Sequence, residues 1–60
     1  MKIPENGSRW EGQTSRDVFR VIHTIELEGH VWVHYRQDSS DREYSCYLES
    51  FLLRFRETAN

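Results

Sequence analysis

The clearest pattern in the sequence is a two-residue alternation between residues 18 and 28, VFRVIHTIELE. One set of alternate positions is apolar apart from one histidine: Phe19, Val21, His23, Ile25 and Leu27. The other set includes Arg20, Thr24 and Glu26, and only Val18 and Ile22 depart from its polar character. Such alternation, with many β-branched residues, predicts a long strand that buries its apolar stripe.

The next segment predicts a β-hairpin. Glu28-Gly29 interrupts the alternation, and residues 30–36 (HVWVHYR) resume it. A two-residue turn sets His23 opposite His34 and Ile25 opposite Trp32.

A three-residue loop instead sets Ile25 opposite Val33 and Leu27 opposite Val31. We favour the three-residue loop, because it places Val31, Val33 and Tyr35 on the face of the main apolar stripe. A bulge could reconcile the two registers along the strand.

Shorter elements are expected on both sides of the hairpin. Residues 8–11 (SRWE) predict a short strand anchored by Trp10, and 43–47 (EYSCY) predict another strand after the polar loop 37–42. Beyond it, apolar residues recur at spacings of three and four, which predicts a short helical turn: Leu48, Phe51, Leu52 and Phe55. Residues 54–57 can form a last strand.

These elements predict one mainly β domain, a small five-stranded SH3-like barrel with a helical turn before the last strand. We expect residues 1–7 to be a flexible lead-in, residues 8–57 to form the domain and residues 58–60 to fray. Sixty residues leave no room for a second core. Closing the sheet would bury one face and leave few edges.

Composition narrows the classes of partner. The ten acidic and eight basic residues are dispersed, and the net charge of −2 provides no basic block for a polyanion. Seven of the eight basic residues are Arg, so a local patch for carboxylates or phosphates is still open. The single cysteine, Cys46, and the absence of a leader or a long apolar run predict a cytoplasmic protein without a membrane segment.

The sequence contains no convincing catalytic, metal or cofactor motif. His23, His30, His34 and Cys46 could ligate zinc, but they lack the paired short spacing of structural zinc sites. Cys46 with a histidine lacks an orienting third group, so we interpret it as a small core residue. The carboxylate pairs of the chain, such as those at positions 38 and 41, are expected in water. We therefore expect a protein that is not an enzyme.

The runs GSRWEG, VFRVIHTIELEG, VWVHYR, EYSC and LESFLLRF carry a resemblance that spans residues 7–55. The chain resembles small bacterial and prophage-encoded SH3-like-barrel proteins of uncharacterised function. The resemblance implies a barrel and a bacterial or phage origin, and it transfers no functional residue.

The second face of the hairpin is the candidate binding surface. It would present Trp32 with His34, Arg20, Arg36 and Tyr47, and aromatic rings beside arginines are frequent at interaction sites. In a strongly bent sheet, however, Trp32 could instead pack against Trp10 or the C-terminal turn.

Two functions follow from this surface. The first is a module that binds a protein, with homodimerisation as a variant. The alternative is a nucleic-acid-binding barrel in which aromatic residues stack on bases and arginines contact phosphate: Trp32, Tyr35 or Tyr47 with Arg20, Arg36, Arg54 and Arg56.

Overall fold

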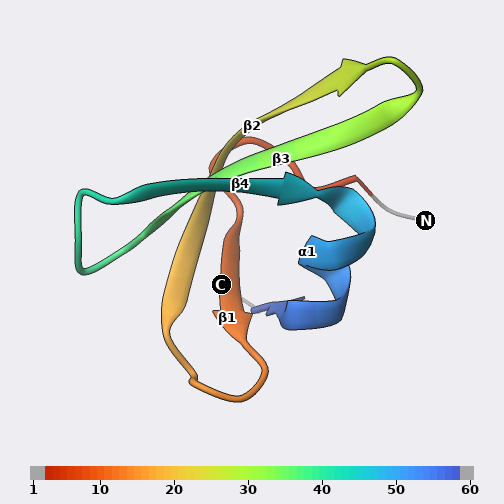
Figure 1. Cartoon of the computed structure of the whole chain (residues 1–60). Coiled ribbons are helices and arrows are strands. Elements are labelled where there is room, and N and C mark those ends of the chain that lie inside the picture. Colours follow the sequence, from red (N-terminus) through yellow and green to blue (C-terminus); the bar gives the residue numbers. More distant parts are fainter. Residues whose placement is uncertain (1–2, 59–60) are drawn as a thin grey trace.

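The computed structural model describes residues 3–58 and contains the elements that the pattern predicts, in the predicted order (Figure 1). The elements are β1 (Arg9–Gly12), β2 (Val18–Leu27), β3 (His30–Gln37), β4 (Glu43–Tyr47), α1 (Leu48–Arg54) and β5 (Phe55–Glu57). The mainly β class and the short helix before the last strand are thus confirmed.

The five strands form one antiparallel sheet in the order β4-β3-β2-β1-β5. β4 and β5 are not hydrogen-bonded neighbours, so the sheet is not closed into the predicted barrel. The helix α1 connects these two edge strands and packs against β3, β4 and β5. The helix therefore lies at the gap between β4 and β5, where strand pairing is missing (Figure 1).

The favoured hairpin register is wrong, and the two-residue turn is the one formed. Leu27 lies opposite His30, and Ile25 lies opposite Trp32. Glu28 and Gly29 between them have φ values of 53° and 80°. Positive φ at both central residues defines the turn type whose twist matches that of the flanking strands.

A bulge at Ile22 corrects a second expectation, that the apolar stripe of β2 lies on one face. Pairing passes from His23 opposite His34 to Val21 opposite Tyr35, which leaves Ile22 without a partner. Because one extra residue reverses the alternation, Val21 lies in the core, whereas Ile25 is exposed. The predicted stripe is therefore divided between two faces.

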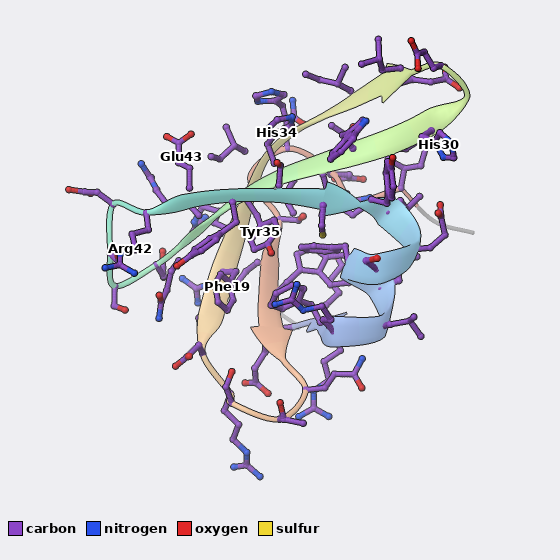
Figure 2. The ribbon with its side chains drawn as sticks, viewed as in Figure 1. Phe19, His30, His34, Tyr35, Arg42 and Glu43 are labelled. Atoms are coloured by element: carbon purple, nitrogen blue, oxygen red, sulfur yellow. The ribbon has the colours of Figure 1, made fainter. Side chains whose placement is uncertain are left out.

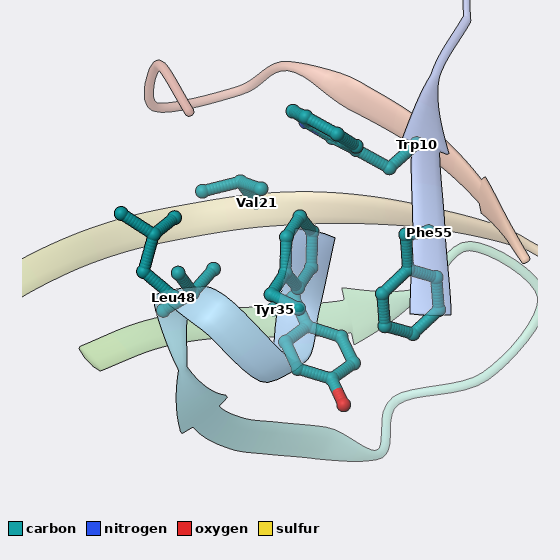
Figure 3. Close-up of a cluster of buried hydrophobic side chains, with 7 residues drawn as sticks. Trp10, Val21, Tyr35, Leu48 and Phe55 are labelled. Carbon is teal, nitrogen blue, oxygen red and sulfur yellow. The ribbon is translucent and has the colours of Figure 1, made fainter. Parts of the chain in front are cut away.

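The core lies between the inner side of the sheet and α1 (Figure 3). Trp10 anchors β1 there, as predicted, and meets Phe51 of α1 edge to face with ring centroids 5.0 Å apart. The buried cluster is mainly aromatic: Trp10, Val21, Val33, Tyr35, Leu48, Phe51 and Phe55. Large rings thus supply much of the buried area that so short a chain needs.

The segments outside the sheet are joined to it by backbone hydrogen bonds. In the predicted lead-in, Pro4 is buried, and the Gly7 N–H donates to the Val21 carbonyl at 2.7 Å. At the other end the Thr58 N–H donates to the Arg9 carbonyl at 3.1 Å, while residues 59 and 60 of the predicted frayed tail lie outside the described residues. The flexibility of both ends stays a prediction.

Candidate binding face

The side of β2, β3 and β4 that points away from α1 is called the outer face here. Alternation along β3 places His34 on this face and Tyr35 on the inner one, and Figure 2 shows the two side chains on opposite sides of the ribbon. All five candidate residues occupy the outer face: Arg20, Trp32, His34, Arg36 and Tyr47. The structure therefore brings the predicted residues together.

Trp32 forms the centre of an aromatic group on the outer face. It lies opposite Tyr47 of β4, and their ring centroids are 4.4 Å apart. The Tyr47 ring also contacts His30, with a centroid distance of 4.9 Å. Trp32 is half-buried by these neighbours on the side of the sheet opposite Trp10, so the alternative packing of Trp32 on Trp10 is wrong.

Two histidines stack across the hairpin on the same face. His23 and His34 are cross-strand partners with ring centroids 4.7 Å apart and planes 18° apart. Cys46, the fourth residue of the hypothetical zinc set, is paired with the buried Val33 and packs against the core on the other side. No group of three or more metal-ligating side chains is found within residues 3–58.

The two arginines of the outer face have acidic neighbours. The Arg20 Nε lies 3.8 Å from the Asp38 Oδ1, and its Nη1 donates to the Gly7 carbonyl. Arg36 lies directly between Arg20 on β2 and Glu43 on β4. Arg54 and Arg56 are elsewhere: one lies over the Phe55 ring, and the other is paired with Glu11. The predicted phosphate-binding set is thus divided between separate surfaces.

The outer face also exposes aliphatic side chains near the tip of the hairpin. Ile25 is 43 % exposed and Leu27 is 58 % exposed, and both follow the bulge. Tyr47, which is 40 % exposed, lies on the other side of Trp32, so Trp32 has Ile25 on one side and Tyr47 on the other. Sequence reasoning missed Ile25 and Leu27, because it assigned them to the core.

A cleft of about 480 Å³ lies at the other end of the sheet, and the sequence did not predict it. The loop between β1 and β2 forms one wall and the end of α1 another, and the rings of Phe19, Tyr35 and Tyr44 face it. The Gln13 Nε2 lies within hydrogen-bonding distance of the carbonyls of Leu52, Leu53 and Phe55. The residues that line this cleft come from segments far apart in the sequence, so no local pattern could reveal it.

The buried Tyr35 and the half-buried Cys46, which packs against the core, both have raised pKa values. Burial raises the pKa of the Tyr35 hydroxyl, and proximity to Cys46 raises it further. Burial also raises the pKa of the Cys46 thiol, against the opposing effect of its hydrogen bond with Tyr35. The neutral thiol is the weaker nucleophile, so this environment suits packing better than covalent chemistry.

No protein-family model, curated protein sequence or solved structure matches this chain. None of the helices in the described part of the chain is long and apolar enough to cross a membrane.

Proposed function

We propose that this domain is a non-enzymatic binding module that docks on another protein through the outer face. The observation that supports this most strongly is the half-buried Trp32, packed on Tyr47 and bordered by exposed Ile25. A rigid aromatic residue surrounded by apolar area is typical of the centre of a protein interface. Arg20 and Arg36 would form a polar rim.

The resemblance to small bacterial and prophage-encoded proteins makes an accessory factor the role that we favour. The element order, with a helix directly before the last strand, is consistent with a relation to SH3-like barrels. The single free Cys46 would suit a reducing compartment such as the cytoplasm.

Nucleic-acid binding is the second candidate, and the presence of aromatic rings and arginines on one face supports it. The same arginines have Asp38 and Glu43 as neighbours, however, which reduces their attraction for phosphate. We therefore favour a protein partner. Binding to nucleic acid would instead weaken steeply with added salt.

Affinity capture from a bacterial lysate with three baits tests this proposal. The wild type should retain a protein, and Trp32→Ala should weaken the interaction about 30-fold or more, as expected for a central aromatic residue. Leu53→Ala is the matched control, because Leu53 is 79 % exposed on α1, away from the outer face. It should bind like the wild type.

Two results would contradict the proposal. One is capture that Trp32→Ala leaves unchanged. The other is a captured species that nuclease destroys and protease does not affect, which would identify the partner as nucleic acid.

A further inference from the structure

The half of β2 beyond the bulge has a free edge in the part of the chain that the structure describes. β1 pairs with β2 from Val18 to Arg20, and the last backbone contacts on this side join Gly7 and Ser8 to Val21. β2 then continues to Leu27 with β3 on its other side only. An unpaired strand edge is a template for another strand.

The pairing pattern identifies the backbone groups that this edge presents. In an antiparallel pair, hydrogen-bonded and non-hydrogen-bonded residues alternate, and the residues that close a two-residue turn are hydrogen-bonded. Leu27, Ile25 and His23 therefore direct their N–H and C=O groups toward β3. Thr24 and Glu26 direct theirs away from β3, to the free side.

Ile25 lies at the centre of this free stretch, with two residues on each side. About Ile25, the outer face carries His23 on one side and Leu27 on the other, with Thr24 and Glu26 between them on the inner face. A second identical strand that runs antiparallel and is centred on Ile25 would set Ile25 opposite Ile25. The same pairing sets Glu26 opposite Thr24, so two carboxylates would not lie directly opposite each other. Ile25 and Leu27 are also the exposed aliphatic side chains nearest to this edge.

We propose that β2 pairs antiparallel with β2 of a second copy of this chain. The two Ile25 side chains meet at the two-fold axis, and Thr24 of each copy forms backbone hydrogen bonds with Glu26 of the other. An interface of this kind is isologous, because the same strand contributes both halves. The site is the edge of β2, so the proposal does not depend on a partner at Trp32.

Amide hydrogen exchange on the wild-type protein tests this pairing directly. In a dimer, the Thr24 and Glu26 amides should exchange more slowly at high protein concentration than at low concentration. The Ile25 amide, which faces β3, should change much less. In parallel, sedimentation should show the mass rising with concentration from 7.3 kDa toward twice that value.

Two proline variants locate the edge that pairs. Thr24→Pro removes an N–H that faces the free side, and proline is tolerated at such edge positions. Ser45→Pro is the matched control, because the same alternation directs its N–H to the free side of β4. Thr24→Pro should abolish the mass increase, and Ser45→Pro should preserve it.

The proposal is overturned if the wild type keeps a mass of 7.3 kDa at millimolar concentration and the Thr24 amide exchanges at a concentration-independent rate. Loss of the dimer in Ser45→Pro, with its retention in folded Thr24→Pro, overturns it as well. If circular dichroism shows that Thr24→Pro is unfolded, the hydrogen-exchange measurement on the wild type decides whether β2 pairs with a second copy. Trp32→Ala tests binding to another protein, and Thr24→Pro tests pairing between two copies. Either result can be negative while the other is positive, so the two proposals are distinguishable.

Discussion

At the scale of single residues, Glu28 in the turn between β2 and β3 has a backbone conformation that does not suit its side chain. Its φ of 53° lies in the left-handed region, where a Cβ atom approaches the following carbonyl oxygen. Gly29, with φ of 80°, has no such penalty. The chain accepts the strain at Glu28 because the two-residue turn requires positive φ at both positions.

Replacing Glu28 with asparagine should therefore stabilise the domain. Asn tolerates the left-handed conformation, so Glu28→Asn is expected to raise the free energy of unfolding by about 0.5–1 kcal/mol, part of the left-handed penalty. Urea denaturation measures this change. Glu28→Ala is the control, because it removes the carboxylate without adding the short polar side chain that can hydrogen-bond locally in the left-handed conformation. Equal stability of the Asn and Ala variants would show that the positive φ at position 28 is not the cause of the stabilisation.

The raised pKa values of Tyr35 and Cys46 predict that the domain loses stability at alkaline pH. Both have a folded-state pKa above the ordinary values of 10.0 and 9.0, so the unfolded chain releases these protons first. Above pH 9 the unfolded state then binds fewer protons than the folded state, and the free energy of unfolding falls as pH rises. Below pH 9 the full stability is present.

Urea denaturation between pH 7 and pH 11 checks this expectation with two variants. Tyr35→Phe should reduce the decline above pH 10, because it removes the buried hydroxyl. Tyr47→Phe, which changes an exposed tyrosine of the outer face, should keep the decline of the wild type. An unchanged decline in Tyr35→Phe would contradict the assignment.

At the scale of elements, the sequence predicted the strands and the helix well because each has a strong local signal. β4 has the predicted bounds, β2 begins at the predicted Val18, and α1 follows from the spacing of Leu48 and Phe51. The pattern predicts Arg54 in the last strand, but this residue ends α1 instead. Element ends depend on one or two hydrogen bonds, so local pattern defines them poorly.

The hairpin register could not be predicted because two local rules conflicted. Placing Val31, Val33 and Tyr35 on the face of the apolar stripe favoured the three-residue loop, whereas Glu28-Gly29 suited a two-residue turn. The bulge at Ile22 resolves the conflict by reversing the alternation, so that Val21 faces inward and Ile25 outward. A bulge has no reliable signature in one sequence, and this one decides which residues form the outer face.

The side chain of Gln13 joins the loop between β1 and β2 to the end of α1. Its side-chain amide lies near three carbonyl groups at the end of the helix, at 3.2–3.5 Å. Gln13→Ala should lower the free energy of unfolding by about 1 kcal/mol, the typical net value of a hydrogen bond. Urea denaturation measures the loss.

The matched variant Gln13→Glu separates hydrogen bonding from packing. Glutamate has nearly the same shape, but its carboxylate only accepts hydrogen bonds and would face three carbonyl oxygens. It should be at least as destabilising as Gln13→Ala. A Glu variant as stable as the wild type would show that the amide donor contributes nothing.

At the scale of the whole molecule, a bent open sheet divides the aromatic residues between two surfaces. Trp10 and Phe51 hold α1 against the inner side, and Trp32 with Tyr47 covers part of the outer side. The sequence alone left open which of these surfaces Trp32 belongs to, because both sides of a bent strand can be buried. The fold answers that question, and the proposed function depends on the answer.

Acrylamide quenching of tryptophan fluorescence tests the exposure of Trp32 most directly. Trp10→Phe leaves Trp32 as the only tryptophan, and Trp32→Phe leaves Trp10, which is 5 % exposed. We predict that Trp32 is quenched several-fold more strongly than Trp10 in the folded protein, and that the two are quenched equally in urea. Equally weak quenching of both in the folded state would place Trp32 in the core and contradict the outer binding face.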